Sequence, residues 1–201
     1  MSFDTIIFEF GDVFINLDKE ATPAALKKLG LEKWSSEIDS LNFNFEKGLI
    51  TRTDFLLGLN KLVPKATQEE VLEAWNGVLL DFPIYRLEFL EKLSKKYQLF
   101  LLSNTDSIHI NHFKEKNGDE FYNRFYNCFE KVYFSYDLGM RKPDEEIYNF
   151  VIKENNLNPK TTLFVDDNFD NIEGAKKTGL QVWHLLKGKE DVIELFKKVK
   201  L

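Results

Sequence analysis

The stretch that decides the fold lies near the start of the chain, where residues 5–13 read Thr-Ile-Ile-Phe-Glu-Phe-Gly-Asp-Val. Its nearly unbroken apolar run is typical of a strand covered on both faces, and the glycine indicates a sharp turn directly after it. One acid, Glu9, interrupts the run close to its end. Burying a carboxylate is costly unless a cation or hydrogen-bond donors compensate. Because parallel sheets bind ligands at the carboxyl ends of their strands, Glu9 is the first candidate for an active centre.

Length and composition predict one medium-sized globular unit, with room for a small insertion. The chain has 201 residues, of which 43% are hydrophobic and 30% charged, and this favours a packed core over disorder. The net charge of −6 argues against nucleic acid or an anionic membrane as a partner. The single cysteine, Cys128, excludes an internal disulfide and is expected to be a small buried apolar residue. With no basic leader and no run of the ~20 apolar residues that span a membrane, we expect a cytoplasmic protein.

Strand and helix patterns alternate over most of the chain. Four further apolar strands are predicted after the first, at residues 98–102, 131–135, 161–165 and 180–186. Amphipathic helices separate them. This alternation predicts an α/β fold with a Rossmann-like parallel sheet flanked by helices.

Between the first and second strands every strong pattern is helical. We therefore predict a small all-helical cap inserted after the first strand. The expected division is a core domain of residues 1–17 and 83–201 and a cap domain of residues 18–82. An insertion that leaves the chain next to Glu9 suits a mobile lid or a specificity cap.

Several local features are expected from particular residues. The segment Thr67-Gln-Glu-Glu70 has the form of a capping box, which opens a helix. Residues 136–142 are expected to form a loop, and Pro143 to lie in the first turn of the helix that follows. A last helix is expected from about Lys189. The aromatic-rich residues 118–129 are ambiguous and are consistent with a second short helix.

Polar residues follow the ends of four predicted strands and would face one crevice. They are Glu9 and Gly11, then Ser103 and Asn104, then Lys142, then Asp166 and Asp167 with Asn171 one turn into the next helix. Two acids and a backbone carbonyl suit Mg²⁺, which binds few carboxylates and keeps several waters. A hydroxyl, backbone amides and an ammonium can hold the oxygens of a phosphoryl group.

Each of these pieces also has an ordinary structural explanation. Asp167 could simply cap the next helix, and the residues from Ser103 to Asp106 could be turn chemistry. Lys142, which precedes a proline, could be a solvated loop cation. The order and spacing of all four pieces together argue for a site.

The four pieces resemble, in order, the four motifs of the haloacid dehalogenase-like hydrolase superfamily. The segment Phe8-Glu-Phe-Gly-Asp-Val-Phe14, followed by Asn16-Leu-Asp18, is similar to the subgroup whose first motif reads Asp-Phe-Gly-Gly-Val. That subgroup includes sugar-phosphate phosphatases resembling glucose-1-phosphate phosphatase, and the N-terminal phosphatase domains of bifunctional epoxide hydrolases. The stretch Phe45-Glu-Lys-Gly48 and the helices around it resemble the subgroup's small cap. The likeness covers almost the whole chain.

The resemblance implies a Mg²⁺-dependent phosphoric monoester hydrolase that acts on small phosphorylated metabolites, with sugar phosphates as one candidate class. The acid at the position of Glu9 would attack phosphorus and form an acyl-phosphate intermediate. Ser103 and Asn104 would orient phosphate oxygens. Lys142 would balance charge on the nucleophile and on the transferring group, so that Glu9, Lys142 and Ser103 carry the catalysis.

The resemblance also implies the metal ligands. Glu9, the carbonyl of Gly11 and Asp166 would bind Mg²⁺, with Asp166 acting directly or through water. Asp167 and Asn171 would support them.

The chain departs from the family at its first motif. The family nucleophile is an aspartate, and this chain has Glu9 instead. The longer side chain moves the carboxylate by roughly 1–1.5 Å, and a misplacement of ~1 Å can lower the reaction rate by about 10²-fold. Gly11 stands where many family members have a second aspartate that acts as general acid, although the resembled subgroup often has glycine there. Asp12 stands where glycine is usual. Aspartate tolerates a left-handed turn, but Asp12 is one residue out of register for the acid role.

Two hypotheses from different classes follow. The first is the phosphatase above, with turnover impaired by Glu9. The second is a catalytically silent relative that binds a phosphorylated ligand or a protein partner. A dehalogenase is a third hypothesis, which the metal-site carboxylates disfavour. Monomer and homodimer are both open.

Two histidines and a tryptophan are weaker candidates. His109 and His112 lie three apart on a predicted helix, and surface or cap-facing positions are expected for them rather than a metal site. Trp75, from the insertion, is a candidate for lining the substrate pocket.

Overall fold

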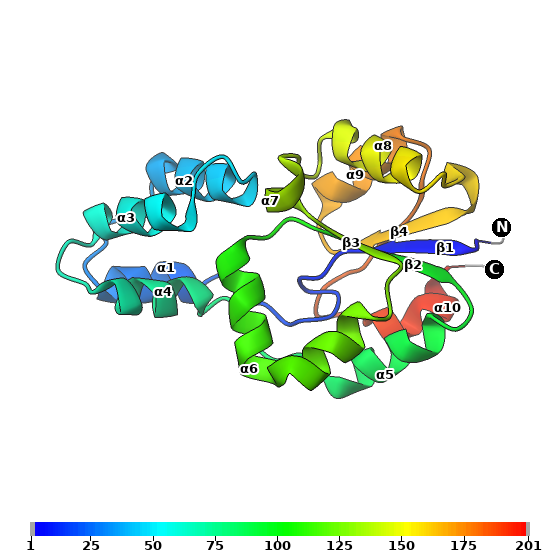
Figure 1. Ribbon diagram of the computed structural model, residues 1–201, viewed down its shortest axis with the longest axis horizontal. Coiled ribbons are helices and arrows are strands. Elements are labelled where there is room, and N and C mark those ends of the chain that lie inside the picture. The colour runs from blue at the N-terminus through cyan, green and yellow to red at the C-terminus, as the bar shows by residue number, and fades with distance from the viewer. Residues whose placement is uncertain (1–2, 200–201) are drawn as a thin grey trace.

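The computed structural model describes residues 3–199 and has the α/β architecture predicted from the sequence (Figure 1). Within these residues, five parallel strands form one sheet in the order β3-β2-β1-β4-β5. The strands are β1 (Thr5–Phe8), β2 (Gln98–Ser103), β3 (Lys131–Phe134), β4 (Thr162–Asp166) and β5 (Gln181–His184).

Helices cover both faces of the sheet, and a separate group of helices stands beyond the carboxyl ends of the strands (Figure 1). One face carries α8 (Glu145–Glu154) and α9 (Phe169–Lys177); the other carries α5 (Ile84–Leu93), α6 (Ser107–Tyr126) and α10 (Leu195–Lys198). The separate group is α1 (Ala21–Lys28), α2 (Ser36–Glu46), α3 (Arg52–Leu62) and α4 (Gln68–Asn76). Short elements complete the chain: α7 (Ser135–Leu138) and the 3₁₀ turns η1 (Pro159–Thr161) and η2 (Val192–Glu194).

Strand β1 lies in the middle of the sheet because all four of its residues are apolar or small enough to be buried on both faces. Phe8 pairs with Leu101 of β2 and with Val165 of β4. The residues that follow Phe8, Leu101 and Val165 therefore lie side by side at the carboxyl edge of the sheet. This register brings Glu9 beside Asp166, with Ser103 one residue further along β2.

An aromatic cluster on the α5 and α6 side holds the turn after β1. The ring of Phe10 packs edge-on against Phe113, with centroids 5.0 Å apart, and Phe14 packs on Phe8 and Phe125. These rings are buried. The chain on both sides of the Gly11-Asp12 turn is thus anchored in the core.

The helical insertion has its own hydrophobic core. Phe45 of α2 stacks on Phe55 of α3 at 4.3 Å, and Phe55 meets Trp75 of α4. The predicted capping box is confirmed: the Thr67 hydroxyl accepts from the Glu70 N–H, and the Glu70 carboxylate accepts from the Thr67 N–H. The helical insertion after β1 is confirmed, and the division at residues 17/18 and 82/83 stays a prediction.

The two linkers between sheet and cap are bonded to each other. The Asn16 N–H donates to the Asp81 carbonyl at 2.9 Å, and the Leu80 N–H donates to the Asn16 carbonyl at 3.0 Å. One step further, the Asp18 N–H donates to the Val78 carbonyl at 2.9 Å. The outgoing and returning chains therefore form a short antiparallel ribbon.

Some local predictions were wrong. Part of the expected loop after β3 is the helix α7, because the Ser135 hydroxyl bonds to the backbone of Thr105 and Gly139 ends the turn in the left-handed region. The helix after Pro143 begins only at Glu145. The suggested second short helix, in contrast, is confirmed: the non-helical Gly118, at φ 80°, divides α6 into two helical segments, the second of which runs to Tyr126.

The end of the chain also differs from prediction. The last strand is shorter than expected, and the expected helix from Lys189 is replaced by η2 and α10. Asp191 accounts for the late start, since its side chain caps η2 at the Ile193 N–H.

Two other predictions concern single features. Cys128 is buried, and burial raises the pKa of its thiol to about 11, which keeps it protonated at neutral pH. Among the helices of residues 3–199, none combines the length and the apolar character needed to cross a bilayer.

Gly174 in α9 lets this helix approach the loop after Lys142. A Cβ atom at this position would overlap the carbonyl oxygen of Pro143, which is backbone and has no rotamer with which to yield. We expect Gly174→Ala to lower the free energy of unfolding by about 1–3 kcal/mol, the usual cost of overpacking. Urea denaturation measures it. The control Lys176→Ala, exposed on the same helix, should change little, and equal losses in both variants would contradict the role of Gly174.

Candidate active site

The turn after β1 presents Glu9 at the sheet edge. The Glu9 N–H donates to the Val165 carbonyl at 2.9 Å, which extends the β1–β4 pairing by one residue, and the side chain is 8% exposed. Asp12 has φ 55°, so aspartate adopts the left-handed turn, as the sequence suggested. Its Oδ1 accepts from the Leu17 N–H at 3.0 Å, which closes the turn.

Both oxygens of the Glu9 carboxylate are bound by donors of the protein. Oε1 accepts from the Ser103 hydroxyl at 2.5 Å, the Phe10 N–H at 2.6 Å and the Gly11 N–H at 3.2 Å. Oε2 forms an ion pair with the Lys142 ammonium. The side chain is therefore folded back over its own turn.

Lys142 is fully buried and is the central cation of the site. Its Nζ donates to Glu9 Oε2, to Asp166 Oδ2 at 2.7 Å and to the Leu102 carbonyl at 2.7 Å. Burial lowers the pKa of Lys142, but the charges of Asp166 and Glu9 outweigh this effect and raise the pKa above its ordinary value. The stabilisation that the ammonium provides is therefore present at every pH below about 10.4, the pKa of an unfolded lysine, and is lost only above it.

Asn104 holds the backbone of Lys142 in place. Its Nδ2 donates to the Lys142 carbonyl at 2.8 Å, and its Oδ1 accepts from the Lys142 N–H at 2.9 Å. In this structure its side chain thus positions the lysine. Its expected role in orienting phosphate oxygens stays a prediction.

The two acids after β4 have different surroundings. Asp166 is fully buried behind Lys142, and its oxygens accept from Lys142, from Asn171 Nδ2 at 3.0 Å and from the Asn168 N–H at 2.8 Å. Asp167 faces the open cavity described below and pairs with Lys19 at 3.2 Å. The cap of α9 is Asn168, so the alternative explanation of Asp167 as a helix cap is wrong.

Nearby cations balance the negative charge of the Asp167 carboxylate only in part. Burial raises its pKa, the negative charges of Glu9 and Asp12 raise it further, and Lys19 acts in the opposite direction without cancelling them. A cation at this position would relieve the repulsion.

The lysines that balance the charge of Asp12 were not predicted from the sequence. Its carboxylate is buried, with Lys187 Nζ 2.9 Å from Oδ1 and Lys19 Nζ 3.3 Å from Oδ2. An acid in a turn enclosed by apolar residues needs such partners, and this was the available signal. Nothing in the spacing indicated which lysines would supply them.

A cavity of about 660 Å³ lies between the sheet edge and the cap. All of the predicted site residues except Asp166 line it: Glu9, Gly11, Ser103, Asn104, Lys142, Asp167 and Asn171. The cap contributes Trp75, as expected, whose ring stacks on His109 from α6 at 5.5 Å. His112 is not among the lining residues.

Further lining residues were not predicted. Asn42 and Glu46 belong to α2, and Arg141 is the residue directly before Lys142. The available signal was weak: Glu46 lies in the stretch that resembles the family's cap, and Arg141 adjoins the predicted lysine.

The sheet topology, the inserted cap and the polar residues at the strand ends together define a capped Rossmann-like α/β protein with a site at the carboxyl edge of its sheet. The chain belongs to the haloacid dehalogenase-like hydrolases, whose family model matches residues 5–179. This confirms the predicted superfamily, while the finer likeness to glucose-1-phosphate phosphatases and epoxide hydrolases stays a prediction.

Several relatives are similar over nearly their whole length. D-ribitol-5-phosphate phosphatase of Bacteroides thetaiotaomicron is 30% identical over 184 residues, which are 89% of each chain. Sesquiterpene phosphatase astK of Aspergillus oryzae is 26% identical over 203 residues, which cover 96% of this chain and 95% of the relative. A crystal structure of a haloacid dehalogenase family enzyme from Bacteroides thetaiotaomicron, in complex with magnesium and inorganic phosphate, matches with a TM-score of 0.86 and 35% identity. That match covers 97% of this chain and all of the other.

The buried ammonium of Lys142 should be essential to the stability of this site. Lys142→Met leaves Glu9 and Asp166 close together and without their shared cation, so we expect a loss of about 3–5 kcal/mol in the free energy of unfolding. Chemical denaturation monitored by circular dichroism measures it. Lys131→Met on β3, which removes an exposed ion pair with Glu154 of α8, is the control and should change little. A Lys142→Met protein as stable as the wild type would show that this lysine does not hold the site together.

Proposed function

We propose that this protein is a Mg²⁺-dependent phosphatase of small phosphorylated metabolites, with polyol and sugar phosphates as the substrate class, and that Glu9 slows its turnover. The observation that carries the proposal is the buried Lys142 ammonium between Glu9 and Asp166, with the Ser103 hydroxyl on the same carboxylate, at the wall of a cavity under the cap. Support also comes from the relatives, which include a D-ribitol-5-phosphate phosphatase and an enzyme crystallised with magnesium and inorganic phosphate.

The proposed chemistry proceeds in two displacements at phosphorus. In the first, a Glu9 oxygen attacks phosphorus, the bond to the ester oxygen breaks, and the leaving alkoxide takes a proton from water. In the second, water attacks the acyl phosphate, which releases phosphate and restores the Glu9 carboxylate. Lys142 compensates the negative charge of the transferring group, and the Ser103 hydroxyl donates to one of its oxygens.

The residues at the cavity fit a hard divalent cation. Among residues 3–199 no cluster of three His, Cys, Asp or Glu side chains forms a ready-made metal cage. Mg²⁺ needs less, since it is commonly held by one or two carboxylates, a carbonyl and water. The raised pKa of Asp167 marks a place where positive charge is lacking. When bound, the ion would neutralise phosphate oxygens and orient the phosphoryl group.

The geometry favours Asp167 over Asp166 as the carboxylate that joins Glu9 and Gly11 on this cation. Asp167 lines the cavity, whereas Asp166 is enclosed and bound to Lys142, Asn171 and the Asn168 backbone. Asp166 would then act by positioning Lys142.

The position of Glu9 also gives a physical reason for slow turnover. Its Oε1 takes up the Ser103 hydroxyl and the N–H groups of Phe10 and Gly11, which are the donors that a phosphate oxygen would use. The carboxylate and the substrate therefore compete for one set of donors. This same observation favours the second candidate function, a silent relative that binds a phosphorylated ligand without turnover.

Shortening this residue should increase activity. Aspartate retracts the carboxylate by one methylene and frees the donors, so we expect Glu9→Asp to hydrolyse p-nitrophenyl phosphate faster than the weakly active wild type, by up to about 10²-fold. Glu9→Gln should be inactive, and EDTA should abolish the activity of both active forms.

The result separates the two candidate functions. An inert wild type with an active Glu9→Asp variant selects the silent relative. If both forms bind Mg²⁺ yet neither hydrolyses the ester, the proposed mechanism is wrong.

Metal binding should depend on Asp167. We expect Asp167→Asn to raise the Mg²⁺ dissociation constant, measured by isothermal titration calorimetry, by about 10–100-fold or more, because it removes a charged ligand. The control Glu173→Gln, at a partly exposed position of α9 where the carboxylate pairs with Lys176, should bind like the wild type. A larger loss of affinity in Asp166→Asn than in Asp167→Asn would contradict the assignment.

A further inference from the structure

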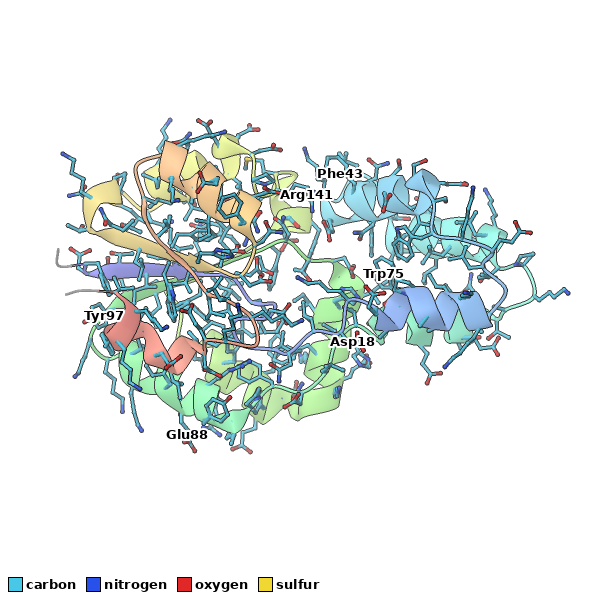
Figure 2. The ribbon with its side chains drawn as sticks, turned by 180° about the vertical axis from the view of Figure 1, so that it is seen from behind. Asp18, Phe43, Trp75, Glu88, Tyr97 and Arg141 are labelled. Carbon is cyan, nitrogen blue, oxygen red and sulfur yellow. The ribbon has the colours of Figure 1, made fainter. Side chains whose placement is uncertain are left out.

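Three polar residues that the reaction does not use line the cavity at the junction of cap and core: Asn42, Glu46 and Arg141. Arg141 Nη2 donates to Glu46 Oε2 at 2.8 Å, and Asn42 Nδ2 donates to Glu46 Oε1 at 3.4 Å. Figure 2 shows Arg141 next to Phe43 at the junction of core and cap, and its guanidinium lies 5.2 Å from the centre of that ring. We refer to Asn42, Glu46 and Arg141 as the polar wall.

The polar wall has unused hydrogen-bonding capacity. Asn42 Oδ1 and Arg141 Nε are both buried and have no hydrogen-bond partner. Most buried polar atoms in folded proteins are paired, so such atoms call for an explanation. One of them is an acceptor and the other a donor. A hydroxyl group, which can both donate and accept, matches this combination.

The charge balance of the polar wall favours a neutral ligand group. The guanidinium of Arg141 is already neutralised by Glu46. Burial raises the pKa of Glu46, the nearby charge of Asp106 adds to this, and Arg141 opposes it only in part. Because Glu46 already balances its charge, Arg141 offers little attraction to a second phosphate or a carboxylate. An uncharged hydroxyl group needs no such attraction and can bind through hydrogen bonds alone.

The polar wall is also in the right place for the far end of a substrate. Arg141 directly precedes Lys142, whose ammonium pairs with Glu9, and both residues line the same cavity. A cavity of about 660 Å³ has room for a phosphoryl group at Glu9 and a carbon chain of sugar size beyond it.

We propose that Asn42, Glu46 and Arg141 bind hydroxyl groups at the non-phosphorylated end of the substrate and thereby select polyol and sugar phosphates over phosphate esters without hydroxyls. This inference rests on the proposed function. It assigns substrate recognition to one face of α2 and to the residue before the central lysine.

The test compares two probes by isothermal titration calorimetry in the presence of Mg²⁺, so that slow turnover does not hide the result. D-ribitol 5-phosphate reports on both ends of the cavity, and inorganic phosphate reports on the Glu9 end alone. We expect Glu46→Gln and Asn42→Ala each to raise the dissociation constant of ribitol 5-phosphate by about tenfold, as the loss of one good hydrogen bond implies. The dissociation constant of inorganic phosphate should change by less than about twofold. Glu91→Gln is the matched control, because Glu91 pairs with Arg124 outside the cavity.

A kinetic comparison gives an independent readout. In a Glu9→Asp background, Asn42→Ala should lower kcat/KM for ribitol 5-phosphate and leave that for p-nitrophenyl phosphate unchanged. Asn42→Ala keeps the ion pair between Glu46 and Arg141, so an effect of this variant is not a loss of the contact between cap and core.

The outcomes distinguish the two levels of the proposal. If the Glu46→Gln and Asn42→Ala variants bind both probes equally more weakly than the wild type, or bind both as well as the wild type, the role of the polar wall is overturned. A wild type that binds phosphate and ribitol 5-phosphate equally well overturns it too, while the proposed function stands. A wild type that binds neither probe overturns both.

Discussion

The site depends on one interaction, the ammonium of Lys142 held between the carboxylates of Glu9 and Asp166. The strand register brings the two acids to the same level, and repulsion would separate them without a shared cation. Lys142 also bonds to the Leu102 carbonyl at the end of β2, so one side chain joins the ends of three strands. Asn104 fixes its backbone from one side. A buried charge of this kind is stable only because every proton of the ammonium has a partner.

The gathering of these groups could be predicted from the sequence. Parallel strands expose their carboxyl ends at one edge, so the polar residues that follow apolar runs must meet there, whatever the details of the helices. This is why the sequence alone indicates Glu9, Ser103, Lys142 and Asp166 as residues of one site. The helical insertion was equally visible, because no run with strand periodicity interrupts it.

What could not be predicted depends on side-chain direction and on partners distant in the chain. Asp166 and Asp167 are neighbours in the sequence, yet one is enclosed and the other faces the cavity, and only the path of the chain after β4 decides which. The amide of Asn104 could equally have met a phosphate. Arg141 and Glu46 lie 95 positions apart and meet only when the cap is folded onto the core. Periodicity carries no information about such pairs.

The paired linkers have a consequence for how this architecture can change. Because the outgoing and returning chains are hydrogen-bonded to each other, the cap joins the core along a single ribbon rather than by two independent tethers. A helical cap of another size could end on the same ribbon without altering the strand ends where Lys142 lies. The helices of the cap and the strand ends of the core can therefore diverge separately, and only contacts across the junction, such as Arg141 with Glu46, would have to change together with the cap.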